Sequence, residues 1–173
     1  MPVFVALLRA VNVGGTGKLP MSDLRALCTK AGFAGAVTYI QSGNVVFRSP
    51  LTEAKVRAKL EAALAARMGQ PVGVLVRTGG ELARVLRDNP FPEAPPNRVI
   101  VTFLGAPPPR GALAGVVAPG GERVKIDGRE VFVHYPEGQG QSKLKIPFAK
   151  LGTGRNLNTV AALSGLAEEI ATK

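Results

Sequence analysis

The sequence predicts an α+β fold with a ferredoxin-like β-α-β-β-α-β N-terminal half, followed by a similar but incomplete α+β second half. Short apolar runs typical of buried strands alternate with longer segments in which apolar residues recur at helical spacing. Turn-forming pairs separate neighbouring strands in both halves. A proline-rich connection at 89–97 separates a first half at 1–88 from a second at 98–173. We expect the halves to form one compact unit.

The first half contains the elements of a split β-α-β fold in order. They are a strand at 3–8, a helix over 20–31, strands at 36–40 and 45–48, a helix over 53–68 and a strand at 72–76. Pro20 suits the first turn of its helix, and Thr52 is a natural N-terminal cap for the next one. Gly43-Asn44, between two β-rich runs, predicts a type II′ hairpin turn. This order is that of ferredoxin-like domains.

The second half repeats this pattern less completely. After a short helix over 80–87, it contains a strand at 98–104, a weak helix near 110–117, hairpin strands on either side of Asp127-Gly128, and helices over 143–150 and 157–171. Asp-Gly predicts a type I′ turn, and Ser142 is a natural cap for the helix that follows it. The segment 152–156 is extended or turn-like, so a convincing final strand is missing. Duplication of one half is therefore a hypothesis.

Composition limits the class of protein and its surroundings. Apolar residues make up 46% of the chain, which excludes a disordered protein. Cys28 is the only cysteine, so no internal disulfide forms, as suits a reducing cytoplasm. The apolar start of the chain is interpreted as a strand rather than a signal peptide, and no stretch is long enough to span a membrane. We therefore expect a cytoplasmic protein without a membrane partner.

Charge points to anions as partners. The chain has 22 Lys and Arg against 12 Asp and Glu, a net charge of +10. Such an excess attracts nucleic acid, anionic lipid and phosphorylated metabolites. Solvated basic surfaces without any partner account for the same charge, and both interpretations stay open.

Glycines between the first strand and the first helix suggest a site for an oxyanion. In NVGGTGK at 12–18, successive backbone N–H groups could face one point. Gly14 and Gly17 are too close together for a phosphate loop, and Leu19 stands where such a loop has Ser or Thr after Lys18. A purely structural turn is the competing interpretation.

Other chemical motifs are weak. Ser142 and Lys145 match the S-x-x-K pattern of acyl enzymes, but the companion elements S-D-N and K-T-G are absent, and a helix cap explains Ser142 better. His134 is the only histidine, so neither a zinc site nor a catalytic triad is expected. The sequence names no cofactor and does not decide whether the protein is an enzyme.

Four segments together match a known family. They are RAVNVGGTGKLPMSDLRAL at 9–27, TYIQSGNVVF at 38–47, GQSKL at 140–144 and GTGRNLNTVAAL at 152–163. The chain resembles the uncharacterised bacterial family called domain of unknown function 1697. Gly154 departs from the family pattern, where a larger residue is common, and so does Leu157, where an aromatic is common. The resemblance implies an α+β fold of ferredoxin-like character and no established activity, substrate or cofactor.

The polar residues of these segments define the candidate ligand site. The predicted set is Arg9, Asn12, Gly14, Gly15, Lys18, Ser42, Asn44, Arg155, Asn156, Asn158 and Thr159. If Arg9 and Arg155 meet, two guanidinium groups would surround one pocket for a small anion or nucleotide. Alternatively, the same side chains tie loops together by bonding backbone groups.

Two further hypotheses stay open beside the small-anion or nucleotide-binding protein. The basic surface and the β-α-β-β-α-β order would suit a nucleic-acid-binding module. The third strand keeps Gly43 and Phe47, but it lacks the basic-glycine-aromatic motif of RNA-recognition domains. A structural or interaction protein without any ligand is the third. The sequence does not indicate the oligomeric state.

Overall fold

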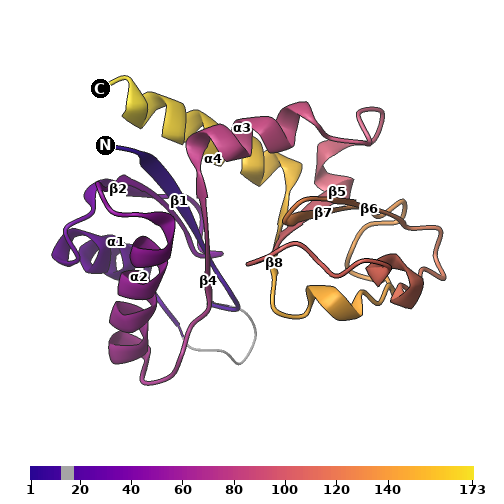
Figure 1. Cartoon of the computed structure of the whole chain (residues 1–173), viewed down its shortest axis with the longest axis horizontal. Coiled ribbons are helices and arrows are strands. Elements are labelled where there is room, and N and C mark those ends of the chain that lie inside the picture. The colour runs from indigo at the N-terminus through magenta and orange to yellow at the C-terminus, as the bar shows by residue number, and fades with distance from the viewer. Residues whose placement is uncertain (13–17) are drawn as a thin grey trace. The chain divides into compact units, whose positions relative to one another are not determined.

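The structure, a computed structural model, describes residues 1–12 and 18–173. Two compact units are present (Figure 1): one contains Met1–Ala83 and Ala162–Lys173, and the other contains Arg84–Ala161. Each unit carries one four-stranded antiparallel sheet, which confirms the α+β class. The predicted connection at 89–97 lies within the second unit, and the predicted division into halves stays a prediction.

The first unit has the predicted ferredoxin-like order. Its elements are β1 (Val3–Leu8), α1 (Met21–Lys30), β2 (Ala34–Thr38), β3 (Asn44–Arg48), α2 (Glu53–Met68) and β4 (Val74–Thr78). The sheet order is β2-β3-β1-β4, with β1 between β3 and β4. Helices α1 and α2 lie side by side against this sheet (Figure 1). As predicted, the Thr52 hydroxyl caps α2 by accepting a hydrogen bond from the Lys55 backbone N–H.

Alternating strand residues build the core beneath these helices. Phe4, Ala6 and Leu8 of β1 belong to one buried cluster with Leu24 of α1 and Leu60 of α2. Because side chains of a strand alternate between its two faces, this cluster marks the helix-facing side of the sheet. Val5 and Leu7 are buried too, which accounts for the uninterrupted apolar run in the sequence.

The predicted two-residue type II′ turn is wrong, because the connection between β2 and β3 is longer. The Tyr39 N–H donates to the Asn44 carbonyl, so residues 40–43 form the turn. Ile40 and Gly43 both have positive φ there. Asn44 belongs to β3 instead, where it pairs with Leu7 and is fully buried. Pairing with β1, which is remote in sequence, therefore overrides the local turn preference.

The second unit has four strands, so the prediction that its final strand is missing is wrong. The strands are β5 (Val99–Phe103), β6 (Arg123–Asp127), β7 (Glu130–His134) and β8 (Thr153–Asn156), in the order β6-β7-β5-β8. The backbone ladder to β5 holds β8, which has no apolar alternation. Gly154 lets the strands approach, since a Cβ atom there would lie 3.0 Å from Ile100 Cγ2.

Two predicted helices of this unit are wrong. Only 3-10 turns form there, at Ala112–Gly115 and Pro147–Ala149. Pro147 disfavours the α conformation in the residue before it, and Val117 pairs with Lys145 through two backbone hydrogen bonds. Ser142 therefore caps no helix.

The predicted hairpin in this unit is confirmed, but its turn type is wrong. Asp127 pairs with Glu130 across the turn between β6 and β7. Gly128 has positive φ and Arg129 does not, as in a type II′ turn, whereas type I′ needs positive φ at both.

The remaining helices follow the prediction. They are α3 (Gly79–Arg87) and α4 (Leu157–Ala171). Thr78 and Glu81 form a reciprocal capping box at the start of α3, in which each side chain accepts from the other residue's backbone N–H. Throughout residues 1–12 and 18–173, the helices are too short or too polar to cross a membrane.

Cys28 provides a chemical test of the first core. Its thiol is buried, and burial raises the pKa of this thiol to about 12. Because the thiolate is the reactive form, we expect the native protein to resist iodoacetamide near pH 8 and the unfolded protein to react rapidly, a difference of about 100-fold or more. Mass spectrometry after timed quenching measures both rates. Rapid alkylation of a protein whose circular dichroism stays native would contradict this placement.

Candidate functional site

Asn12 fastens the two ends of the glycine segment together. Its Nδ2 donates to the Leu19 carbonyl at 2.8 Å, and its Oδ1 accepts from the Leu19 N–H at 2.7 Å. The same Nδ2 donates to the Gln41 carbonyl at 2.9 Å, in the turn between β2 and β3. Asn12 has a φ of 56°, a left-handed conformation that asparagine tolerates. Its amide therefore holds residues 12 and 19 beside each other and against this turn.

The Asn44 side chain stabilises the turn between β2 and β3 by hydrogen bonds to residues of that turn and of the segment before it. Its Nδ2 donates to the Tyr39 carbonyl at 2.9 Å and to the Ser42 hydroxyl at 2.8 Å. The Leu8 N–H donates to the Gly43 carbonyl, which joins the turn to the end of β1. The turn, the end of β1 and Asn12 consequently form one polar end of the first sheet.

Two cations lie next to this end of the sheet in the sequence, Arg9 after β1 and Lys18 before Leu19. Arg9 follows β1 directly, and its backbone N–H donates to the Gly73 carbonyl. Its aliphatic stem packs on Gly73, where a Cβ atom would lie 3.0 Å from Arg9 Cδ. Lys18 is exposed and adjoins Leu19, which Asn12 binds. We call Arg9, Asn12, Lys18, Ser42 and Asn44 the sheet-end cluster.

The other predicted site residues lie where β8 meets α4 in the second unit. Arg155 is 7% exposed, and its Nη1 donates to the Thr153 hydroxyl and to the Gly154 carbonyl. Burial lowers the pKa of the Arg155 guanidinium to about 10. Asn156 caps α4, because its Oδ1 accepts from the Thr159 N–H at 2.9 Å. Asn158 is exposed.

The predicted residues thus form two groups, one in each unit. The sheet-end cluster belongs to the first unit, and Arg155, Asn156, Asn158 and Thr159 belong to the second. A pocket shared by Arg9 and Arg155 stays a prediction. Gly14 and Gly15 lie outside the described residues, and so does the backbone at 13–17 for which the sequence predicts oxyanion binding.

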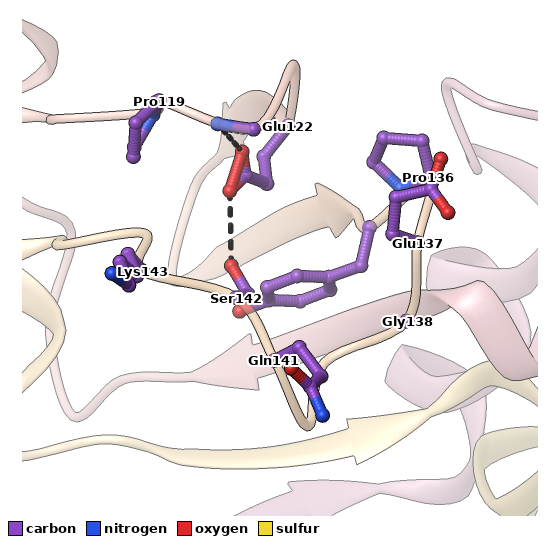
Figure 2. Close-up of a pocket in the computed structure, with 10 residues that line it drawn as sticks. Pro119, Glu122, Pro136, Glu137, Gly138, Gln141, Ser142 and Lys143 are labelled. Carbon is purple, nitrogen blue, oxygen red and sulfur yellow. Dashed lines mark hydrogen bonds between the residues drawn. The ribbon is translucent and has the colours of Figure 1, made fainter.

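A cavity that sequence reasoning missed lies in the second unit (Figure 2). Its volume is about 350 Å³, and Glu122, Tyr135 and Ser142 line it together with Pro119 and Pro136. The Ser142 hydroxyl donates to Glu122 Oε1 at 3.0 Å, and the Gly120 N–H donates to Oε2 at 2.8 Å. Of its lining, only Gln141, Ser142 and Lys143 carried a signal in the sequence, as part of the family segment at 140–144 and, for Ser142, as a predicted helix cap. We call this feature the Glu122 cavity.

The Glu122 cavity is polar at one side and aromatic at another. Ser142 Oγ also accepts from the Leu144 N–H at 3.1 Å, so the hydroxyl is oriented to donate to Glu122. Tyr135 is almost completely buried, and its burial raises the pKa of the phenol. The negative charge of Glu122 raises that pKa further, against the effect of a hydrogen bond from Gln139.

The proline-rich connection is anchored within the second unit. The Arg123 guanidinium lies over the Phe91 ring at 4.5 Å and binds Glu93 at 2.6 Å. This hydrogen bond is the main cause of the lowered pKa of the Glu93 carboxyl. His134 accepts from Arg123 Nε at 3.3 Å, so the only histidine takes part in a surface contact of β7.

The family described as "Protein of unknown function (DUF1697)" matches residues 1–132. The chain belongs to this family. The DUF1697 match covers the first unit's sheet and the sheet-end cluster, and it ends within β7. Of the four segments that carry the resemblance, those at 140–144 and 152–163 lie beyond the matched residues.

One solved structure is similar over nearly the whole chain. It is "The structure of conserved bacterial protein SP0830 from Streptococcus pneumoniae", with 22% sequence identity and a TM-score of 0.77. The match covers 96% of this chain and 98% of that one, and it shows a shared fold. No curated protein matches the chain. Family membership therefore assigns no reaction, and the function has to be argued from the geometry.

Proposed function

We propose that this DUF1697 protein binds a small anion, such as inorganic phosphate or the phosphate group of a nucleotide, at the sheet-end cluster. The observation that supports this proposal best is the set of three hydrogen bonds made by the Asn12 amide. Two of them join Asn12 to Leu19 across the glycine-rich segment, and the third joins Asn12 to the turn between β2 and β3. Arg9 and Lys18 lie close to these residues in the sequence. Glycine-rich sequences that lead into a helix are common anion sites in proteins, and nearby cations strengthen such binding.

The cluster divides into positioning groups and ligand-contacting groups. The amides of Asn12 and Asn44 bind backbone carbonyls, so these two residues position the loops. Arg9 and Lys18 supply positive charge, and an anion gains most from charge-assisted hydrogen bonds. We therefore assign the loop-tying role to the two asparagines and the ligand-binding role to the two cations.

Titration calorimetry with inorganic phosphate, ATP and a phosphosugar tests the proposal. Replacing Arg9 by Gln or Lys18 by Ala removes one charge-assisted contact, so we expect the affinity of each variant to fall about tenfold. Lys59→Ala, which removes an exposed cation from α2, is the matched control and should bind like the wild type. Binding that survives loss of both Arg9 and Lys18 would place the anion elsewhere.

The same titrations distinguish the alternatives. Binding of short RNA alone, with an affinity that falls steeply as salt rises, would favour the nucleic-acid module. Net charge is the main support for that module, since Phe47 is fully buried and stacks on Phe33 at 4.3 Å. No binding of any anion would leave a structural or interaction role.

A further inference from the structure

We propose that the Glu122 cavity is a second, independent site, and that it binds a small organic ammonium ion with an apolar body. The cavity lies wholly within the second unit, so the inference does not depend on the anion site of the first. It rests on three features: a carboxylate held by neutral donors, an apolar lining of fitting size, and local acidity in a strongly basic protein.

The carboxylate of Glu122 is the recognition group. The Ser142 hydroxyl and the Gly120 N–H donate to it, and neither donor carries a charge. A carboxylate has about four lone-pair positions, so each oxygen keeps acceptor capacity after these two bonds. An ammonium group that reaches it gains a charge-assisted hydrogen bond, and the charge of Glu122 is then neutralised. Figure 2 shows the carboxylate and the Ser142 hydroxyl directed toward each other at the cavity.

The remaining lining suits the body of such a ligand. Tyr135 and two prolines, Pro119 and Pro136, present mainly apolar surface. An aromatic face attracts a cation through its quadrupole as well as by apolar contact. The volume of about 350 Å³ is within the range of cavities that hold small molecules.

Charge decides against an anionic ligand in this cavity. Glu122 and Glu137 both line it, and Lys143 is the single cation among the lining residues. The balance among the lining side chains is thus negative, although the whole chain carries +10. An anion would meet the Glu122 carboxylate at short range, where repulsion is little screened.

The chain offers a clean spectroscopic test. It contains two tyrosines and no tryptophan, so in a Tyr39→Phe background Tyr135 is the only strong fluorophore. The probe is cyclohexylamine, which has no fluorescence of its own and is protonated at neutral pH, like a lysine ammonium. Cyclohexanecarboxylate has the same ring with the opposite charge and is the matched ligand control. We expect saturable quenching or enhancement of Tyr135 with the amine only.

Variants connect that signal to Glu122. Glu122→Gln keeps an oxygen acceptor for the Ser142 hydroxyl but removes the charge, so we expect amine affinity to fall about tenfold. Glu169→Gln, which removes an exposed carboxylate of α4 outside the cavity, is the matched control and should change affinity less than about threefold. Ser142→Ala tests the orienting hydroxyl without altering charge and should weaken binding by less than Glu122→Gln.

Three results would contradict an ammonium site at Glu122. Equal binding of amine and carboxylate, or an unchanged affinity in Glu122→Gln, would overturn the proposal. A flat Tyr135 signal together with no heat of binding in calorimetry with cyclohexylamine would overturn it as well. Circular dichroism of each variant, compared with the wild type, shows whether a lost signal reflects the ligand contact or unfolding.

Discussion

Gly43→Ala is expected to lower the free energy of unfolding by about 2–4 kcal/mol, through backbone strain and overpacking together. Gly43 has a φ of +87°, and a Cβ atom there would lie 2.7 Å from Val11 Cγ2 and 2.9 Å from Leu8 Cβ. Both neighbours belong to the buried core at the end of β1, so neither moves at low cost. Urea denaturation, followed by circular dichroism, measures the change.

The first unit provides a control with the same backbone angle. Gly32 has a φ of +88°, and a Cβ atom added there would meet no atom within 4 Å. Gly32→Ala therefore suffers the conformational strain alone, which costs about 1 kcal/mol. The difference between the two variants isolates the steric term. If both variants lost the same free energy of unfolding, Val11 and Leu8 would have moved to make room for the new Cβ atom. The turn at 40–43 would then not be packed on β1 as described.

Phe47→Ala is expected to cost about 3–5 kcal/mol, because it removes a large side chain from the core. Phe47 is fully buried. Its ring stacks on that of Phe33 with the centroids 4.3 Å apart, and its centroid lies 6.3 Å from that of the Phe4 ring. Phe47→Leu keeps most of the apolar volume and should cost only about 1–1.5 kcal/mol. Thermal and urea unfolding of the two variants measure this difference.

The Phe47 variants also bear on the nucleic-acid alternative. A ring within the core is not available to stack on a base, so Phe47→Leu should leave any RNA affinity unchanged. RNA binding that is lost in a variant of native stability would contradict the placement of this ring. It would then restore β3 as part of a stacking surface.

The candidate sites show where sequence reasoning succeeds and where it ends. Asn12 and Asn44 stand out in the sequence by their turn-rich surroundings, but only the structure shows that their amides bind the Leu19, Gln41 and Tyr39 carbonyls. The Glu122 cavity was missed because its lining residues come from segments that no local pattern connects. The loop before β6 and the loop after β7 supply them, and backbone pairing such as that between Val117 and Lys145 holds these loops together.

The sequence by itself determined the elements of the first unit and the long terminal helix. Their signals are local: β1 is one apolar run, α2 has a cap and an apolar stripe, and α4 repeats apolar residues at helical spacing. Only the tertiary structure decided β8, the turn at 40–43 and the loss of the helix predicted over 143–150. In each case a remote partner supplies the hydrogen bonds: β5 for β8, β1 for Asn44, and Val117 for Lys145. Backbone groups must be paired wherever they are buried, and a partner distant in sequence outweighs weak local preferences.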